Sequence, residues 1–466
     1  DILLRNHQPF NPNGKKFNLA PLICGSEGTL GVVVRAKLKL VELPNHKGLM
    51  VGHFSSDLAA FSLINRLLEH TPAAVEYMDK LTLDASKGNI QQACNRSWIK
   101  GNPESVLIIE FFSDTQRQLD LKMRDCKNWL LNHNCYHVEV LKPNEQYKVW
   151  EIRKAGLGLL MGKVGPKKAL TVIEDAAVPI KHLYSYYQHM KKYITSQNTS
   201  AVYYGHASVG LIHIRPLLNL TNVDDRTKML NIAKESSKTV KRFKGSLSGE
   251  HGDGRIRSAF LREQFGENIY KHLVDLKKVF DPYNLFNPGV IISDQAMLSN
   301  LRGVKQPTNN FDTILNWSND ISFFYAAEKC NGAGVCRQSV GRGIMCPSYK
   351  ATREDRFSTR GRANLLRRAL DSNITSSELK NNNLEEALDL CLGCKACKRE
   401  CPANVDMTKL KSEYLFQTQK NQNQFELWYI KNLGRILKFG SYIPNIFNIF
   451  KNNYFVMKAM GFHRQS

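Results

Sequence analysis

The sequence of 466 residues is too long for one hydrophobic core and predicts about two to four domains. Hydrophobic residues make up 42% of it, an ordinary globular composition, and no apolar run reaches the roughly 18 residues that would suggest a membrane span. The net charge of +23 is compatible with nucleic acid, an acidic membrane surface or an acidic redox partner, but no zinc-finger, RRM-like or basic-zipper pattern accompanies it, so it favours a solvated basic surface and no nucleic-acid partner.

A glycine loop is the first feature along the chain. Residues 25–31 read GSEGTLG, and the β-branched and then alternating residues 32–40 that follow predict a strand. The chain starts with Asp1 and shows no targeting pattern, so we expect a fragment of a longer protein.

Between about residues 45 and 290, short apolar runs alternate with helical patterns, which predicts an α+β domain. Two prolines, Pro282 and Pro288, are expected to stop its last helix. The predicted strands are residues 48–53 and 106–112, and the predicted helices are residues 57–70, 116–133 and 263–280.

Three histidines and one glutamate stand in glycine-marked segments. Residues 201–216 predict two strands joined by a turn that would bring His206 and His213 together, and a later loop, SGEHGDG, adds Glu250 and His251. Two histidines and one carboxylate suit Zn or a similar divalent metal with an open coordination position, which lowers the pKa of a bound substrate hydroxyl. His251 would then be free to act as general base. Each histidine alone favours a structural role, whereas the group favours function.

Two cations upstream complete a predicted substrate site. Arg153 is expected near the end of a helix, before Gly156 and Gly158, where a guanidinium can clamp a carboxylate with two hydrogen bonds. Lys168 precedes an expected strand over residues 170–174 and can assist; a solvated cation is an equal alternative for this lysine.

Seven of the eleven cysteines fall between residues 330 and 401. Cys391, Cys394, Cys397 and Cys401 follow the ferredoxin spacing C-x2-C-x2-C-x3-C-P. A four-cysteine zinc site is the alternative, but zinc ribbons pair two C-x2-C units over a longer spacer and need no Cys-Pro step. Because iron–sulfur loops need reduced thiolates, the cysteine usage predicts a reducing cytoplasm.

The first cysteine group lacks one ligand. Cys330 and Cys336 have the spacing of first and third ligands, with Ala333 at the second position, and Cys346 is followed by proline. The last cysteine of each loop binds the cluster of the other loop, so Cys346 would complete a 4Fe-4S cluster with the first three cysteines of the second group. Cys401 would join Cys330 and Cys336, which predicts either a 3Fe-4S centre or a 4Fe-4S centre with a non-cysteine ligand.

The polar residues 293–320 lack periodicity and predict a linker. Residues 321–416 form the expected iron–sulfur domain, with a helix at 361–370, and residues 417–466 begin a further helical region. Between residues 425 and 450, aromatic residues alternate with basic ones. This stretch predicts a helix packed on a neighbouring domain, with peripheral contact to a membrane surface as the alternative.

Six motifs together resemble a known family: residues 25–31, Trp150-x-x-Arg153, Ile173-Glu174-Asp175 with Val178-Pro179, Gly205-His206-Ala207, residues 249–252 and residues 281–289 (DPYNLFNPG). They resemble the FAD-linked oxidases of the vanillyl-alcohol oxidase type, in the D-2-hydroxyacid dehydrogenase branch, fused to a module like the iron–sulfur component of glycerol-3-phosphate dehydrogenase. The resemblance covers nearly the whole chain. It implies the end of an FAD-binding, PCMH-type domain at residues 1–44, the α+β C-terminal domain of these oxidases at residues 45–292, and a mostly helical ferredoxin-like domain.

The resemblance also implies a role for each candidate residue. FAD contacts would come from Gly25, Ser26, Glu27, Gly28, Thr29 and Asn287. Arg153 and Lys168 would hold the substrate carboxylate, while the metal ligands would be His206, His213 and Glu250. His251 would take the hydroxyl proton as hydride leaves for the flavin.

The implied function is oxidation of D-lactate or D-2-hydroxyglutarate to the 2-oxo acid. Electrons would pass through the clusters to a quinone, cytochrome or flavoprotein, in the cytoplasm or at the inner membrane surface. The alternatives are an electron-transfer module with an inactive flavin half and a glycolate-type oxidase that uses oxygen directly.

Two departures from the family pattern affect these expectations. Val209 and Leu211 occupy places where the commoner motif has Asp and Asn, with Arg215 as a replacement cation. The first half of the FAD domain and a later cysteine-rich segment are missing, so this chain alone is expected to bind FAD poorly.

Overall fold

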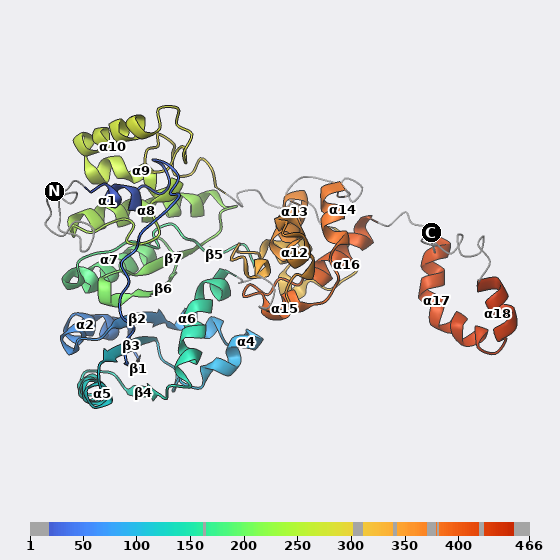
Figure 1. The fold of residues 1–466 in the computed structure, drawn as a ribbon, viewed down its shortest axis with the longest axis horizontal. Helices are drawn as coiled ribbons and strands as arrows, with labels where there is room; N and C mark the ends of the chain where they lie inside the picture. Colours follow the sequence, from blue (N-terminus) through green and yellow to red (C-terminus); the bar gives the residue numbers. More distant parts are fainter. Residues whose placement is uncertain are drawn as a thin grey trace. The chain divides into compact units, whose positions relative to one another are not determined.

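The computed structural model describes residues 18–161, 165–301, 311–338, 343–370, 379, 382–418 and 424–451. By their contacts, these residues divide into two compact units (Figure 1). As far as they are described, the first unit comprises the chain up to residue 301 together with residues 329–335 and 399–404. The second comprises residues 311–328, 336–398 and 405–451.

The described part of the first unit is built around an antiparallel sheet of seven strands, in the order β4-β1-β3-β2-β6-β7-β5 (Figure 1). Its strands are β1 (His46–Phe54), β2 (Ala74–Asp79), β3 (Ser105–Ser113), β4 (His137–Leu141), β5 (Lys168–Ala169), β6 (Ala201–His206) and β7 (His213–Leu218). Its helices are α1 (Ala20–Cys24), α2 (Asp57–Leu67), α3 (Lys80–Ala85), α4 (Ile90–Ala93), α5 (Gln116–Leu131), α6 (Gln146–Met161), α7 (Leu183–Ser196), α8 (Val223–Arg242), α9 (Gly254–Phe265) and α10 (Glu267–Phe280).

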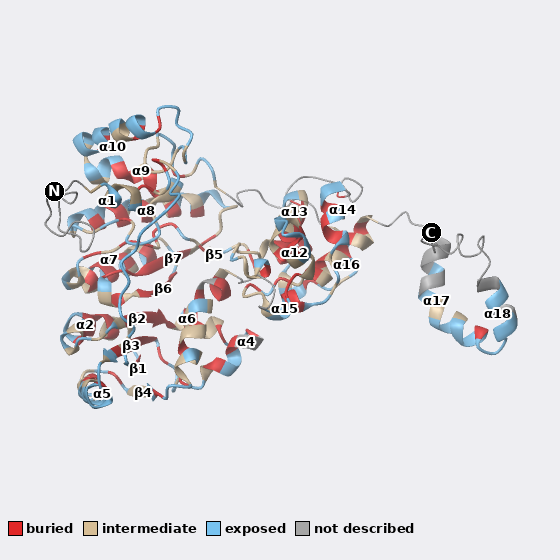
Figure 2. Ribbon diagram, in the orientation of Figure 1, coloured by how far each residue is buried: buried red, intermediate tan, exposed pale blue. Residues whose placement is uncertain are grey.

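The two faces of the sheet bury different side chains, because successive residues of a strand point to opposite faces. Tyr77 and Ile214 enter the larger hydrophobic cluster, with side chains from α2, α5, α7 and α8. Met78 and Tyr204 enter a second cluster, with side chains from α3 and α6. Figure 2 shows the strands buried between these layers. The predicted histidines and Arg153 lie on the α6 face.

The described part of the second unit is helical, apart from short turns. Its helices are α11 (Phe323–Glu328), α12 (Pro347–Thr352), α13 (Thr359–Leu370), α14 (Asn382–Asp389), α15 (Ala396–Glu400, which crosses the unit boundary), α16 (Met407–Thr418), α17 (Gln424–Gly440) and α18 (Pro444–Lys451). Two buried charges join them. Arg362 on α13 donates to Ser348 and to the backbone oxygen of Ala387, and Glu413 on α16 accepts from the backbone of Ile314 and the indole of Trp317. None of the described helices combines the length and apolar character needed to cross a bilayer.

Most of the predicted local elements are confirmed. Residues 48–53, 57–70, 106–112 and 116–133 correspond to β1, α2 with a following 3-10 turn (Leu68–His70), β3 and α5, and residues 361–370 to α13. The predicted hairpin between residues 201 and 216 is present as β6 and β7.

Three predictions at element level are wrong. Residues 32–40 form no strand: Val34 is 96% exposed and Leu40 is 86% exposed, and no described strand pairs with them, which a strand requires. The strand at residues 170–174 is also absent, since the backbone there turns to place Glu174 in the site. The helix expected over residues 263–280 is broken at Gly266, whose φ of +83° ends α9 before α10 begins.

A fourth correction concerns the helix that carries Arg153. This helix, α6, continues through Gly156 and Gly158 to Met161. Gly156 lies against α3, where an added Cβ would approach Thr82 to 3.2 Å. Close helix packing therefore explains this glycine better than a helix end does.

Candidate active site and iron–sulfur ligands

The hairpin of β6 and β7 carries two of the predicted metal ligands. His206 ends β6 and His213 begins β7, and their rings lie 5.4 Å apart. The close turn requires Gly205, which has a φ of +154° and whose added Cβ would lie 2.7 Å from the backbone oxygen of Leu211. The predicted hairpin thus brings both imidazoles to one place.

A buried carboxylate shapes the loop that carries Glu250 and His251. Asp175 is fully buried and accepts hydrogen bonds from the hydroxyl of Ser248 and from the backbone N–H groups of Glu250 (3.2 Å) and His251 (2.9 Å). These bonds satisfy the N–H groups of Glu250 and His251, next to the backbone hydrogen bond from Gly249 to the Asp175 oxygen. In the sequence, Asp175 is recognisable only as part of a motif. Its hydrogen bonds to this loop join residues more than 70 positions apart and could not be predicted from local patterns.

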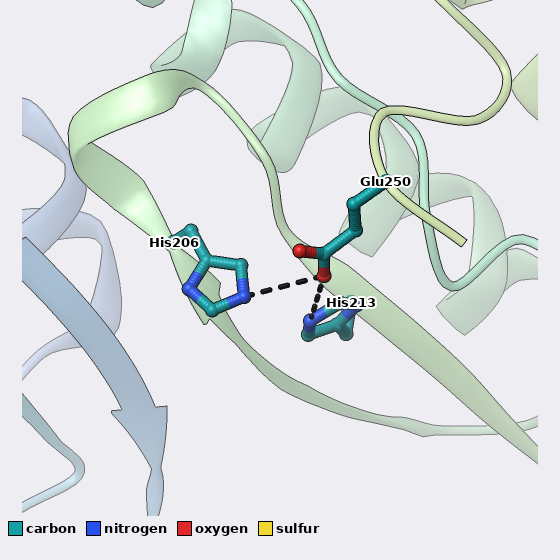
Figure 3. A group of neighbouring side chains, drawn as sticks. All are labelled: His206, His213 and Glu250. Carbon is teal, nitrogen blue, oxygen red and sulfur yellow. Dashed lines mark ion pairs between the residues drawn. The ribbon is translucent and has the colours of Figure 1, made fainter. Parts of the chain in front are cut away.

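Three imidazoles converge on one oxygen of Glu250. The Nε2 atoms of His206, His213 and His251 lie 3.2, 3.4 and 3.2 Å from Glu250 Oε1. Figure 3 shows the first two contacts, which reach the carboxylate from the two residues that flank the hairpin turn. The ligand atoms of His206, His213 and Glu250 all lie within 4.8 Å of one another, and two imidazoles with one carboxylate are a donor set that suits Zn²⁺ or a similar ion.

His251 lies as close to Glu250 as the two predicted ligands do. Its ring stacks on that of His213 at 5.3 Å, and its Nδ1 lies 3.5 Å from Glu174. Asp175, Glu250 and His251 form a second group with ligand atoms close enough to hold a cation. The geometry therefore gives His251 two possible roles, metal ligand or general base at the edge of the metal site.

Hydrogen bonds at Nδ1 prepare the two hairpin imidazoles to bind through Nε2. His213 Nδ1 lies 2.5 Å from the backbone oxygen of Glu174, and burial lowers the pKa of His213 to about 3. His213 is therefore neutral at pH 7, with the Nε2 lone pair available. His206 Nδ1 lies 2.5 Å from Glu76, and this hydrogen bond raises the pKa of His206 despite partial burial.

Two guanidinium groups flank Tyr204 on the same face of the sheet. Arg153 lies 5.1 Å from the Tyr204 ring centre, donates from Nε to Glu76 at 2.8 Å, and forms an ion pair with the same oxygen through Nη2 at 2.7 Å. Arg215, two residues beyond the ligand His213, lies 5.4 Å from the same ring and pairs with Glu174. Arg215 is only 2% exposed, and its Nε and Nη1 find no hydrogen-bond partner among the described residues.

Lys168 lies apart from this group. Its backbone is paired with Leu218, five residues along β7 from His213, a separation of roughly 17 Å. Directly opposed residues of neighbouring strands share a face, so Lys168 points with Leu218 away from the face that carries His213. The structure therefore does not bring Lys168 into the cluster, and its predicted role remains a prediction.

The predicted FAD contacts do come together. The Asn287 side chain donates to the backbone oxygen of Glu27 (2.6 Å), and an added Cβ at Gly28 would lie 3.1 Å from the same amide. Buried Lys277 donates to the backbone oxygens of Thr29 and Phe286, both at 2.7 Å. Gly25 and Gly28 are exposed, whereas the Ser26 side chain is buried and donates to the backbone. An exposed glycine turn beside an amide suits a flavin cofactor.

Glu27 has a second partner that the sequence did not indicate. Its carboxylate accepts from the backbone N–H groups of Asp253 (2.6 Å) and Gly254 (2.9 Å), where α9 begins. A carboxylate at a helix start is stabilised by the unpaired N–H groups there. Glu27 thus ties the glycine loop to the segment that follows His251.

In the second unit, Cys346, Cys391, Cys394 and Cys397 line one pocket. This is the set that crossed ligation predicts for the complete 4Fe-4S cluster, although Cys346 lies 45 residues before the others. Cys346 precedes Pro347 at the start of α12, a position where proline costs no hydrogen bond. The Cys346 sulfur accepts from the backbone N–H of Thr359 at 3.0 Å, and burial raises the pKa of its thiol to about 11. Four cysteines around one pocket fit an iron–sulfur cluster.

The remaining three predicted cluster cysteines do not fall in one unit. Cys330 and Cys401 belong to the first unit and Cys336 to the second. Cys336 is buried and accepts a hydrogen bond from the backbone N–H of Arg360 at 3.3 Å. Backbone N–H groups directed at sulfur are typical of cluster ligands.

Two family models match the chain. The model of the C-terminal domain of FAD-linked oxidases matches residues 43–291, which form most of the first unit. The chain belongs to the FAD-linked oxidases. A model of the 4Fe-4S dicluster domain matches residues 326–405, so this FAD-linked oxidase also carries an iron–sulfur domain. The resemblance drawn from the motifs, the α+β fold with a helical iron–sulfur domain, and the FAD and iron–sulfur character are thereby confirmed.

Several curated proteins are similar to this FAD-linked oxidase. A D-2-hydroxyglutarate dehydrogenase of Pseudomonas putida is 26% identical over 96% of this chain and 48% of its own length. A mitochondrial D-lactate dehydrogenase (cytochrome) of Arabidopsis thaliana is 24% identical over 59% of this chain and 47% of its own. The chain thus spans about half the length of these relatives. A solved 4-ethylphenol oxidase from Gulosibacter chungangensis is 10% identical, covers 55% of this chain and 56% of its own, and has a TM-score of 0.41, too low to carry an argument.

Proposed function

We propose that the protein to which this chain belongs is an FAD-dependent dehydrogenase that oxidises a D-2-hydroxy acid to the 2-oxo acid. The convergence of three imidazoles on Glu250, within one cluster that also contains Arg153, carries the proposal. A 2-hydroxy acid presents a carboxylate and a hydroxyl on adjacent carbons. A guanidinium and a divalent ion close to it suit those two groups.

Each site residue has a defined task in this proposal. Arg153 holds the substrate carboxylate, while His206, His213 and Glu250 hold a divalent ion, Zn²⁺ or similar, that lowers the pKa of the substrate hydroxyl. His251 accepts the hydroxyl proton, and Glu174, 3.5 Å from its Nδ1, stabilises the resulting imidazolium. The glycine loop and Asn287 would hold FAD, which would supply the two-electron acceptor for the hydride of C2, so that the acid would lose two electrons and two protons in all.

A dicarboxylic substrate, D-2-hydroxyglutarate, is the favoured choice. Arg215 provides a second cation on the same face, and two of its donors are buried without a partner among the described residues. A substrate with a second carboxylate would satisfy them. The relative that matches 96% of the chain, iron–sulfur region included, is also a D-2-hydroxyglutarate dehydrogenase. D-Lactate is the second candidate, because the dehydrogenase of Arabidopsis thaliana matches 59% of the chain.

Electrons would leave the flavin singly through two clusters. The first is a 4Fe-4S cluster on Cys346, Cys391, Cys394 and Cys397. The second, on Cys330, Cys336 and Cys401, is a 3Fe-4S centre or a 4Fe-4S centre with a non-cysteine ligand. The acceptor would be a quinone, a cytochrome or another flavoprotein.

A peripheral contact with the inner membrane surface, from the cytoplasmic side, completes the proposal. Helix α17 and the residues after it expose Trp428, Phe439 and Tyr442, among the basic residues Lys431 and Arg435. Aromatic and basic side chains in one helical stretch favour binding to an anionic lipid surface.

The test is a panel of D-2-hydroxy acids offered to the full-length protein with an artificial electron acceptor, with and without a chelator. We expect reduction of the acceptor with D-2-hydroxyglutarate, a higher KM for D-lactate, and loss of both activities on chelation that added Zn²⁺ or Mn²⁺ restores. Equal turnover after complete removal of divalent ions would contradict the metal's role. Absence of turnover with every acid would contradict the proposal as a whole.

A further inference from the structure

Glu76 is a buried carboxylate shared between two parts of the site. It lies on β2, directly opposite His206 on β6, and is 7% exposed. Its Oε1 lies 2.5 Å from His206 Nδ1, while its Oε2 accepts a hydrogen bond from Nε of Arg153 and forms an ion pair with Nη2 of the same residue. One oxygen therefore serves the metal ligand, and the other serves the cation assigned to the substrate carboxylate.

Each contact restricts a functional group in a different way. A carboxylate at Nδ1 fixes the ring orientation of a metal-binding histidine and makes Nε2 a better ligand. The hydrogen bond from Nε and the ion pair from Nη2, both to one carboxylate oxygen, restrict the position of the Arg153 guanidinium. The backbone of Glu76 is held in the paired strand β2. A movement of its carboxylate therefore changes the contact with His206 and the contact with Arg153 together.

We propose that Glu76 is a positioning residue that couples metal binding at His206 to substrate binding at Arg153. When a substrate carboxylate draws Arg153 toward it, the carboxylate of Glu76 is released from part of its partner and binds His206 more strongly. Metal and substrate should therefore each tighten the binding of the other, as linkage requires of any two coupled sites. This inference rests on the proposed function for the metal at His206 and for the substrate carboxylate at Arg153.

The test measures metal binding first, without turnover. The full-length protein and its Glu76→Gln variant are stripped of divalent ions and titrated with Zn²⁺ against a chromophoric chelator, with and without the inert analogue glutarate. We expect the Zn²⁺ affinity of the variant to fall about 10- to 100-fold, which is the usual cost of removing a carboxylate behind a metal-binding histidine. Glutarate should tighten Zn²⁺ binding to the wild type and leave the variant unchanged.

Glu139→Gln is the matched control. Glu139 lies on β4 of the same sheet and also pairs with a histidine, His137, at 2.9 Å, outside the site. This variant should bind Zn²⁺ as the wild type does and respond to glutarate in the same way. Arg153→Met separates the two halves of the inference: it should keep most of the Zn²⁺ affinity measured without glutarate and lose the response to glutarate.

The outcomes divide clearly. Wild-type Zn²⁺ affinity and an unchanged glutarate response in Glu76→Gln would overturn the inference. If Glu76→Gln fails to fold, Glu76→Asp keeps the charge but shortens the reach, and unchanged metal binding in that variant would overturn the inference equally. If no D-2-hydroxy acid is oxidised but Glu76→Gln still weakens Zn²⁺ binding, the substrate assignment fails while the positioning of His206 stands.

Discussion

The imidazole site of the first unit and the thiol pocket of the second hold their predicted metal-binding side chains in different ways. In the imidazole site, hydrogen bonds fix both the side chains and the loop. Glu76 bonds to His206, the backbone oxygen of Glu174 bonds to His213, and Asp175 accepts from the backbone of the Glu250 loop. In the second, burial raises the pKa of Cys346 to about 11 and also raises that of Cys397. These two buried thiols are therefore protonated until a metal cluster compensates for the charge of their thiolates.

The two sites therefore differ in whether their side chains stay in place before a metal binds. The buried groups Glu76, Asp175 and His213 are hydrogen-bonded to other side chains or to the backbone, and a buried polar group with its partners in place costs little, so the site can persist without its ion. Buried thiolates are too costly to form alone, so cluster insertion and order in the pocket should be linked. Variants that change only the thiol pocket or only the imidazole site test this difference.

The largest expected effect is in the thiol pocket. Cys346→Ala removes one of the four ligands, so we expect loss of the 4Fe-4S cluster, seen as a lower iron and sulfide content and a lost EPR signal after reduction. Zn²⁺ binding at Glu250 should be unchanged. Cys126→Ala is the control, because Cys126 is a buried thiol on the core-facing side of α5, outside the pocket. A full iron content in Cys346→Ala would contradict the crossed ligation.

The next effect falls on the imidazole site. His251→Ala in the full-length protein should lower kcat by about 10²- to 10⁴-fold, the usual contribution of a general base. The Zn²⁺ content should stay at the wild-type level, and both clusters should remain. Loss of the bound ion along with activity would instead assign His251 as a ligand, in line with its 3.2 Å contact to Glu250.

His53, a buried imidazole outside the site, shows how burial of a histidine changes the stability of the fold with pH. His53 is fully buried on β1, and burial lowers its pKa to about 4. Between pH 6.5 and 4 the unfolded chain binds a proton that the folded chain does not, so stability falls as the pH falls through this window. We expect a loss on the order of 2–3 kcal/mol, which follows from the size of the shift. The stability of His53→Gln, from denaturant unfolding at several pH values, should change less over this range, and an equal slope would disprove the assignment.

The smallest expected effect is on the cluster potential. The Thr359 hydroxyl lies 2.9 Å from the sulfur of Cys346, and hydrogen bonds to sulfur stabilise the reduced, more negative state of a cluster. Thr359→Val should therefore make the reduction potential more negative without loss of iron, measured by EPR-monitored redox titration. The control is Thr352→Val in the same unit: the Thr352 hydroxyl bonds to backbone groups, the oxygen of Ser348 and the N–H of Glu354, so its loss should leave the potential unchanged.

Local patterns predicted much of the fold because the determining contacts are local. The helices at residues 57–70 and 116–133 begin at side-chain caps, Ser56 and Thr115, that a sequence displays directly. Residues 32–40 show the limit of such patterns: their alternation suits a strand, but strand formation depends on a partner elsewhere. Gly266 shows another limit, since a helical pattern continues across a single residue whose backbone breaks the helix.

The family and the predicted ligand types follow from the sequence alone: cysteines at C-x2-C-x2-C-x3-C-P spacing, two histidines on either side of an expected turn, and a glutamate and a histidine in a glycine loop. Three features become visible only in the folded chain. Glu76 is hydrogen-bonded to His206, Asp175 accepts from the backbone of the Glu250 loop, and Lys168 is paired with Leu218 on the other face of the sheet from His213. The physical reason is distance along the chain. Glu76 and His206 are separated by 130 residues and meet through strand pairing, and the register and facing of strands follow from the packing of the whole sheet.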